Sequence, residues 1–443
     1  MVLAAAPEAW FTLFGYGVRS HDLWIVATGA ACSVACGLVG CFLVLRRMSL
    51  LGDAISHAIL PGLAVAFMVT QSREPMAMLA GALAVGVLTA VLSHGLSRWG
   101  RVPEDAAMGV VFTALFAVGV VLVTLVARDV DLDPGCVLYG LIEFAPFDTV
   151  RVGGVELPRT FVWLGVILLV NAGLIALFFK ELKIVCFDPF LATTMGISAG
   201  VVHYGLMTAV AATCVASFEA VGSILVVAML VAPGATAHLL TDRLGRMLWV
   251  SAAVAAASAV LGYGFAVWLN TSVAGMISTA ALGLFVAAAL FAPRHGWVAR
   301  EARRARLSLR IVEEDILGLL YRWHERAYSS QYAGLKQGEV LQAVQAPVLG
   351  RVAVLVLVRR GLVSRGSGLL HPTQSGLAAA QRVVRGHRLW ESYLAKHLGV
   401  AADRLHTTAH RAEHFLSAEI QENLGAQVEG ERDPHGKPIP PMR

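Results

Sequence analysis

The segment LGDAISHAILPGLAVA (Leu51–Ala66) places an acid and an imidazole within an apolar run that predicts a membrane-spanning helix. Asp53 and His57 are four residues apart, so in a helix they lie on one face, about 6 Å apart at Cβ. Ionisable groups within a span usually face a bundle interior or a water-filled path, and carboxylate with imidazole is a ligand set for zinc, manganese or iron. One interpretation of the pair is therefore a metal site. The alternative is an acid that favours the helix dipole and a histidine that bonds to a neighbouring helix.

Composition sets the class of protein. The 443 residues are 57% hydrophobic and 15% charged, which excludes a chain that is soluble throughout. The net charge is +5, and much of the excess lies after Pro293. All six cysteines precede residue 215 and form neither a disulfide framework nor a CxxC zinc site. The first twenty residues lack a basic n-region, so we expect no cleavable signal peptide.

The apolar runs predict about nine spans, each roughly 20 residues long. We place them at 23–45, 54–71, 76–97, 105–127, 160–179, 199–217, 219–240, 248–269 and 272–292, with eight spans or a re-entrant piece as the alternative near Ser217. Basic residues fall in alternate short loops, which favours a cytoplasmic position for those loops. They are Arg46, Arg47, Arg98, Arg101, Lys180, Lys183, Arg243, Arg246, Arg294 and Arg300. This pattern predicts the N-terminus outside and the C-terminus inside.

Other polar groups fall within the predicted spans, at His94, Asp105, His203, Glu219 and His238. Each of them taken alone is interpreted as a packed or interfacial residue. Glu219 is singled out because an anion at the outer end of a tight turn attracts an arriving cation.

The loop KELKIVCFDPFLATTMGIS (Lys180–Ser198) predicts a short cytoplasmic helix that begins at Asp188 and Pro189. The alternative is an ordinary connector. Its apolar and small residues favour docking to a partner protein; they are Phe190, Leu191, Ala192, Met195 and Gly196.

Three segments together resemble the permease subunit of ABC importers for zinc, manganese or iron, over approximately residues 20–295. They are LGDAISHAILPGLAVAF, FDPFLATTMGIS and EAVGSILVVAMLVAPGATA (Glu219–Ala237). The resemblance implies that Asp53 and His57 line the metal path and that Asp188–Gly196 is the helix that contacts the ATPase. The chain has no GxxxxGK[ST] loop, so we expect it to bind no nucleotide and a separate ATPase subunit to hydrolyse ATP.

After Pro293 the chain becomes basic and polar. The arginines between 300 and 310 predict a linker beside the anionic inner leaflet. Beyond it we expect helices at 311–327, 336–345 and 347–360, then the hairpin LVSRGSGLLHP with Gly366 and Gly368 at its turn. That order is typical of a winged helix. Two further helices are expected, at 372–398 and 401–424.

The last predicted helices carry a second group of imidazoles and carboxylates. His410, Glu413 and His414 have the spacing i, i+3 and i+4, with His406 one turn earlier, while His387 and Glu391 form an i, i+4 pair. This density favours metal binding, with a solvated charged surface as the alternative.

HRLWESYLAKHLGV, LHTTAHRAEHFLSAEI and DPHGKPIP resemble the metal-sensing and dimerisation domain of the diphtheria-toxin-repressor family, over about 311–442. The resemblance implies that His387, His410, Glu413 and His414 are primary ligands. It implies that His406 and Glu391 are ancillary ligands and that Asp315 is a ligand from an early helix. Gly318 and His410 depart from the family pattern, which leaves the metal open among manganese, iron and zinc.

The expected recognition helix, PVLGRVAVLVLVRRG, offers apolar side chains where a reader of base edges needs polar ones. We therefore expect sequence-specific DNA binding to be lost or weak and this helix to pack on a partner protein.

The sequence thus predicts an all-α protein with a polytopic membrane bundle followed by a cytosolic winged-helix and helical metal-sensing part. We divide it into 1–295, a linker at 296–310, 311–375 and 376–443. The predicted function is a permease subunit of an ABC importer for a divalent transition metal in the bacterial inner (cell) membrane, not itself an enzyme. Its partners would be an ABC ATPase, an extracytoplasmic metal-binding protein and a second permease, identical or paired. The alternatives are a membrane-tethered, metal-dependent DNA-binding regulator and, less well supported, an efflux antiporter.

Overall fold

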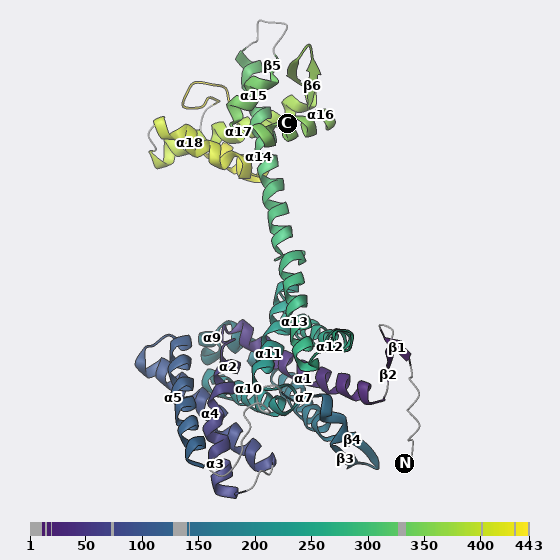
Figure 1. Cartoon of the computed structure of the whole chain (residues 1–443). Helices are drawn as coiled ribbons and strands as arrows, with labels where there is room; N and C mark the ends of the chain where they lie inside the picture. Colours follow the sequence, from purple (N-terminus) through teal and green to yellow (C-terminus); the bar gives the residue numbers. More distant parts are fainter. Residues whose placement is uncertain are drawn as a thin grey trace. The chain divides into compact units, whose positions relative to one another are not determined.

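The chain folds as two compact units, Met1–Ala299 and Arg300–Arg443. The computed structural model describes residues 11–13, 16–18, 20–71, 75–126, 140, 142–326, 334–399, 402–428 and 431–441. Both units are built mainly of helices (Figure 1).

The first unit is a bundle of apolar helices with two short hairpins. Its strands are β1 (Phe11–Leu13), β2 (Tyr16–Val18), β3 (Thr149–Val152) and β4 (Val155–Pro158). Its helices before β3 are α1 (Ser20–Leu45), α2 (Leu51–Ala58), α3 (Leu60–Thr70), α4 (Pro75–Gly100), α5 (Glu104–Val126) and the 3-10 helix η2 (Ile142–Phe147). After β4 follow α7 (Arg159–Leu177), α8 (Phe179–Phe187), α9 (Pro189–Thr194), α10 (Ala199–Val221), α11 (Ser223–Leu240), α12 (Leu244–Leu269) and α13 (Val273–Phe291).

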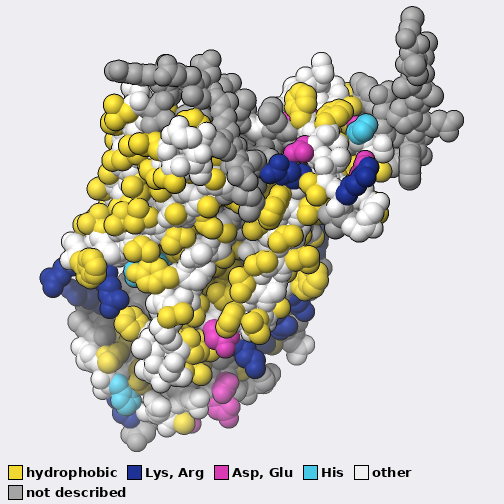
Figure 2. Space-filling model, turned by 90° about the horizontal axis from the view of Figure 1, so that it is seen from below, with side chains coloured by type: hydrophobic (Ala, Val, Ile, Leu, Met, Phe, Trp, Pro, Cys, Tyr) yellow, Lys and Arg dark blue, Asp and Glu magenta, His cyan; other side chains and the backbone are white. Residues whose placement is uncertain are grey.

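The core of this bundle is built around α1, which packs against α7, α10, α11 and α12 (Figure 1). Cys36 and Phe42 on α1 are fully buried. Outward-facing apolar side chains cover much of the face of the first unit seen in Figure 2. An apolar exterior of this extent is typical of a protein whose solvent is lipid.

Among the described residues of this unit, eight helices are long and apolar enough to cross a membrane, and Leu225–Leu240 is a shorter apolar helix. The chain is therefore a multi-pass membrane protein. The predicted second span, 54–71, is interrupted, because α2 ends at Ala58 and α3 begins at Leu60 with a proline in its first turn. The turn predicted near Ser217 lies later in the chain, at Gly222. This glycine separates α10 from α11 and has a left-handed φ of 84°. The side chain of Glu219 lies outside the described residues.

Close approach of α3 and α4 depends on glycine. A Cβ added to Gly62 would lie 2.3 Å from the Gly81 carbonyl oxygen, and one added to Gly81 would lie 2.4 Å from that of Gly62. Small residues that let two backbones approach in this way are typical of helix contacts in membranes.

The second unit begins within α14 (Trp297–Arg326), followed by β5 (Leu335–Lys336), α15 (Gln337–Val344), α16 (Pro347–Arg359), β6 (Val363–Gly366) and β7 (Leu369–Pro372). β7 lies between β5 and β6 in an antiparallel sheet. Ser367 and Gly368, with φ of 52° and 77°, form the hairpin turn, as the type I′ pattern requires. The predicted helix, helix, helix and hairpin order is therefore present.

The basic stretch predicted as a linker at 296–310 is helical from Trp297 onward and belongs to α14. Ion pairs one turn apart stabilise it: Arg304 Nη1 lies 2.7 Å from Glu301 Oε1, and Arg310 Nε lies 2.8 Å from Glu314 Oε1.

The rest of the second unit consists of α17 (Gln374–Leu398), α18 (Ala402–Ala412), the 3-10 turn η3 (Glu413–Phe415) and α19 (Ala418–Gln427). The single helix predicted at 401–424 is wrong. The Ser417 hydroxyl accepts a bond from the Ile420 backbone N–H, so Ser417 caps a new helix. Glu413 and His414 therefore lie on a turn and not on the face of a continuing helix.

Candidate metal sites and docking helix

The Asp53 and His57 side chains lie together on α2. His57 Nε2 is 3.5 Å from Asp53 Oδ1, and both side chains are half-exposed. The His57 ring stacks on Phe112 of α5 and meets Phe116 edge to face. The two groups are thus close enough to share one cation, as their i, i+4 spacing predicts.

Asp53 also lines a cavity of about 910 Å³ between the start of α2 and the helices α11 and α13. The walls are mostly apolar, with hydroxyls supplied by Ser49, Ser272, Ser278 and Thr279. His57 is not among the lining residues. The Asp53 carboxylate therefore faces the cavity, whereas the His57 imidazole packs against the aromatic rings of α5.

The short helix α9 begins where the sequence predicts. Asp188 is its N-cap, and Asp188 Oδ1 accepts hydrogen bonds from the backbone N–H groups of Phe190, at 3.0 Å, and Leu191, at 2.9 Å. Pro189 occupies the first turn, where its missing N–H costs nothing. Gly196, with φ of 83°, follows the helix.

The large apolar side chains of α9 and of Met195, which follows it, face outward, whereas Ala192, predicted as part of the same surface, is fully buried. Phe190 is 86% exposed, and Leu191 and Met195 are also exposed. Exposure of its largest apolar side chains does not stabilise a six-residue helix.

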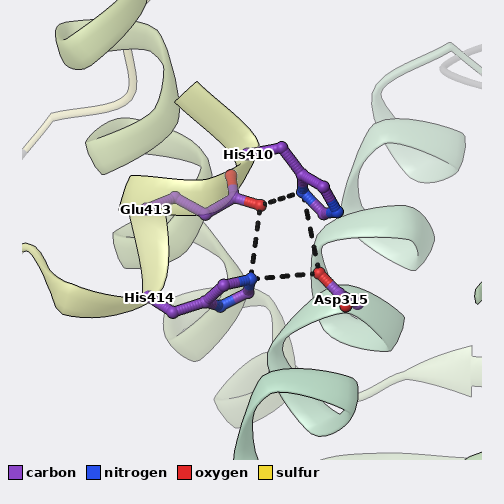
Figure 3. A group of neighbouring side chains, drawn as sticks. All are labelled: Asp315, His410, Glu413 and His414. Carbon is purple, nitrogen blue, oxygen red and sulfur yellow. Dashed lines mark hydrogen bonds and ion pairs between the residues drawn. The ribbon is translucent and has the colours of Figure 1, made fainter. Parts of the chain in front are cut away.

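In the second unit, four side chains from two distant segments form site A, defined as Asp315, His410, Glu413 and His414 (Figure 3). Asp315 comes from α14, and the other three come from the end of α18 and η3. His410 Nδ1 lies 2.6 Å from Glu413 Oε1, and His414 Nε2 lies 3.3 Å from Asp315 Oδ1. Glu413 and His414 are almost fully buried, whereas His410 is half-exposed.

Three further side chains form site B, defined as His387, Glu391 and His406. Within it, His387 Nε2 lies 2.9 Å from Glu391 Oε1, and His406 Nδ1 lies 3.2 Å from the same oxygen. Glu413 connects the two sites, because its Oε1 faces His410 while its Oε2 lies 2.7 Å from His387 Nδ1. This grouping differs from the one the resemblance implied, since His387 lies with the ancillary pair.

Both sites fit a divalent transition metal. Asp315 Oδ1, His387 Nδ1 and Glu413 Oε2 are buried and lack a hydrogen-bond partner. His387 Nδ1 and Glu413 Oε2 approach to 2.7 Å without the alignment of a hydrogen bond. Buried donor atoms that crowd together without bonding are what a bound cation would satisfy. Imidazole with carboxylate suits manganese, iron or zinc.

A neighbouring carboxylate sets the orientation of one ligand. His414 Nδ1 lies 2.8 Å from Glu314 Oε2, which leaves Nε2 directed at site A. An outer carboxylate that fixes the ring of a metal-binding histidine is a common feature of metal sites.

The electrostatics show that protons hold the ligands together without a metal. Burial lowers the pKa of His414, but the Asp315 and Glu314 carboxylates outweigh it and raise that pKa to about 9. Burial raises the pKa of Glu413, but contacts with His387 and His410 outweigh it and lower that pKa to about 2. The Glu413 carboxylate also raises the pKa of His410. Site A thus holds an ionised Glu413 carboxylate and a protonated His414 imidazole, and a metal at His414 has to displace that proton.

Two contributors were not predicted as site residues. Glu314 is adjacent to Asp315, and only the tertiary contact with His414 reveals it. His435 Nε2 lies 3.9 Å from Glu391 Oε1, at the edge of site B. His435 stands in the quoted DPHGKPIP segment, so its type and position gave a signal that the spacing rules did not use.

The comparisons with known proteins match the two units separately. A model of the ABC 3 transport family matches residues 22–292. The chain belongs to the ABC 3 transport family. A second model, described as the iron dependent repressor, metal binding and dimerisation domain, matches residues 373–441. That range contains all the residues of sites A and B except Asp315.

Relatives of this ABC 3 family chain are membrane proteins of metal transport systems. It is 47% identical over 285 residues to a manganese transport system membrane protein of Bacillus subtilis, covering 64% of this chain and 96% of the relative. It is 39% identical over 360 residues to a zinc transport system membrane protein of Treponema pallidum, covering 81% and 97%. The second match is longer than the 299-residue first unit, so it extends into the second.

Among solved structures, PsaBC from Streptococcus pneumoniae in complex with Fab is similar, with a TM-score of 0.53 and 29% identity. The match covers 64% of this ABC 3 family chain and 96% of that one.

Proposed function

We propose that this chain is the permease subunit of an ABC importer that carries a divalent transition metal across the membrane, with its second unit as a metal-sensing regulatory tail. Membership in the ABC 3 transport family supports the permease assignment, and the manganese and zinc transport relatives indicate the class of substrate. The match of residues 373–441 to a metal binding and dimerisation domain carries the second half.

In this proposal Asp53 and His57 contact the ion as it crosses. An acid and an imidazole 3.5 Å apart within an apolar bundle would otherwise be costly, and a cation offsets that cost. The cavity beside Asp53 offers room for the ion with part of its hydration shell. The hydroxyls in its wall would replace water ligands along the way.

The proposed partners follow from the surfaces and from what the chain lacks. A separate ATPase would cover the exposed residues of α9, Phe190, Leu191 and Met195. An extracytoplasmic metal-binding protein would deliver the ion, and a second permease, identical or paired, would complete the path. The sequence has no phosphate-binding loop of the GxxxxGK[ST] type, so this chain would depend on the ATPase for energy.

For orientation we propose the N-terminus outside and the second unit in the cytoplasm of a bacterial cell. The basic residues in alternate loops support this orientation. It needs an odd number of crossings, so the shorter apolar helix Leu225–Leu240 would be the ninth span beside the eight longer ones.

We propose that the second unit consists of a winged-helix part at 311–375 and a metal-binding part at 376–443, and that sites A and B read cytosolic metal. A cation there would take the place of the protons that hold the ligands in the metal-free state. Asp315 links site A to α14, which begins at Trp297, directly after the last apolar helix. Metal binding would therefore act on the helix that leads out of the membrane unit and would inhibit further uptake.

A membrane-tethered DNA-binding regulator is the second candidate. The winged-helix order favours it, but the chemistry of α16 does not. Val348 is 76% exposed, and Val352 and Leu355 are also exposed on this helix. Base edges are read by hydrogen-bonding side chains, so this surface favours a protein partner over DNA.

Uptake of radioactive or fluorescently detected Mn²⁺ and Zn²⁺ by cells or vesicles tests both halves. A chain truncated after Arg300 should transport but no longer slow down as internal metal accumulates, and the double variant Glu413→Ala with His414→Ala should behave alike. Equal inhibition of both variants and wild type would exclude the sensor role. Metal-dependent binding of the full chain to a specific promoter would favour the DNA-binding candidate.

A further inference from the structure

In the described part of the first unit, the unsatisfied buried polar groups belong to three residues that lie near helix ends. Among the described residues of this unit, buried side-chain nitrogen and oxygen atoms without a hydrogen-bond partner belong to Arg46, Ser93 and His203. The atoms are Arg46 Nη1, Ser93 Oγ and both ring nitrogens of His203. Ser93 and His203 are each only 3% exposed. Such groups cost free energy unless something fills their hydrogen bonds.

These residues come from the ends of three helices. Arg46 follows the last residue of α1, His203 lies in the first turns of α10, and His94, next to Ser93, lies in the last turns of α4. The His94 and His203 ring centroids are 4.4 Å apart, and both rings meet Tyr204 at about 5.5 Å. Arg46 and His94 both act electrostatically on His203.

The chemistry of the group selects an anion. A guanidinium only donates, a hydroxyl donates, and a neutral imidazole has one N–H to donate. No ion pair to an acidic side chain is found for Arg46 or His203 in the described part of the chain. A transition metal would suit the two imidazoles but is repelled by the arginine, so the charge of the group disfavours it.

We propose that Arg46, Ser93 and His203, with His94 at the rim, bind a phosphate group supplied by the headgroup of an anionic phospholipid. Arginine matches the geometry of phosphate oxygens, and the hydroxyl and imidazole would complete the set. The residues lie at or within about two turns of the ends of three candidate membrane spans, the part of a span that is nearest to headgroups. Arg46 and His94 are only partly buried, so part of the group is accessible from outside the bundle. Basic groups at cytoplasmic helix ends commonly recognise anionic lipids.

The purified full-length chain in detergent is the material for the test, with phosphatidylglycerol, phosphatidylcholine, inorganic phosphate and Mn²⁺ as separate probes. Native mass spectrometry counts bound lipid, and thermal unfolding measures stabilisation. Phosphatidylglycerol should bind the wild type and raise its unfolding temperature. Arg46→Gln should weaken that binding roughly tenfold, because a charge-assisted hydrogen bond is lost.

The adjacent Arg47 is the matched control, since it is exposed and carries the same charge. Arg47→Gln should bind the lipid as wild type does, and Arg46→Lys should retain part of the affinity. If Arg46→Gln fails to fold, Ser93→Ala replaces it, as a smaller change expected to weaken binding less.

Four results would overturn the proposal. They are equal lipid binding by the Arg46→Gln and Arg47→Gln variants, equal stabilisation of the wild type by phosphatidylcholine and phosphatidylglycerol, absence of any lipid effect, and Mn²⁺ binding that His203→Phe abolishes. Stabilisation by inorganic phosphate alone, lost in Arg46→Gln, would retain the phosphate group but overturn the lipid as its source.

Discussion

Glu413 offers the sharpest test of the second unit, because one carboxylate faces both metal sites. Glu413→Gln keeps the shape of the side chain and removes its charge. Contacts with His387 and His410 outweigh burial and lower the Glu413 pKa from 4.5 to about 2. A shift of about 2.5 pKa units corresponds to about 3 kcal/mol of folding free energy at neutral pH.

The sign of the pH dependence follows from that depressed pKa. The contribution of Glu413 is present above the unfolded pKa near 4.5 and is lost as pH falls through about 2. Glu413→Gln should therefore destabilise the metal-free second unit by about 3 kcal/mol at pH 7 and by progressively less below pH 4. Metal affinity should fall roughly 100-fold or more, since loss of even an outer-shell partner typically costs 10–100-fold.

The assay uses the full-length chain in an Asp53→Ala background, so that the proposed transport site contributes no metal. Metal content by mass spectrometry, competition with a fluorescent chelator and thermal unfolding are measured together. Glu419→Gln is the matched control, because Glu419 is exposed on α19 only six residues away. Equal metal affinity and equal stability of the Glu413→Gln and Glu419→Gln variants would refute the assignment of Glu413 to both sites.

Three further predictions address transport, coupling and proton exchange. Asp53→Ala or His57→Ala should abolish metal uptake at unchanged membrane abundance, whereas Asp105→Ala, at an exposed acid on α5, should not. Normal uptake by the Asp53→Ala and His57→Ala variants would exclude the pair from the metal path. Leu191→Glu should uncouple ATP hydrolysis from transport in the reconstituted complex, because an unpaired charge at a docked apolar surface costs several kcal/mol. The control variant Leu191→Met should remain coupled. An unchanged ATPase rate and unchanged transport in Leu191→Glu would contradict the docking role of α9. The carboxylates around His414 raise its pKa to about 9, so metal binding should release a proton at pH 7 and should become tighter as pH rises towards 9. Calorimetry in buffers of different ionisation enthalpy measures the number of protons released. Metal binding without proton release would count against His414 as a ligand.

Several local features were predictable because their causes are local. The start of α9 follows from Asp188 and Pro189, whose cap and fixed φ act within one turn. Gly368 lies at the β6–β7 turn as predicted, but Gly366, also predicted there, is the last residue of β6, and Ser367 is the other turn residue. The i, i+4 spacing brings Asp53 and His57 together. The segment predicted as a basic linker is helical from Trp297 onward, and Arg–Glu pairs one turn apart stabilise this part of α14.

By itself, the sequence determined the membrane class, the approximate spans, the start of the short helix α9 and the residue types that form sites A and B, because hydrophobic runs, caps and residue chemistry depend only on near neighbours. Tertiary structure alone decided that Asp315 meets His414 across 99 positions, that Glu413 divides its oxygens between sites A and B, and that His203 is buried without a partner beside His94. Spacing rules reach one or two helical turns. Contacts between distant segments are fixed by how whole helices pack, which depends on the shapes of all their side chains together.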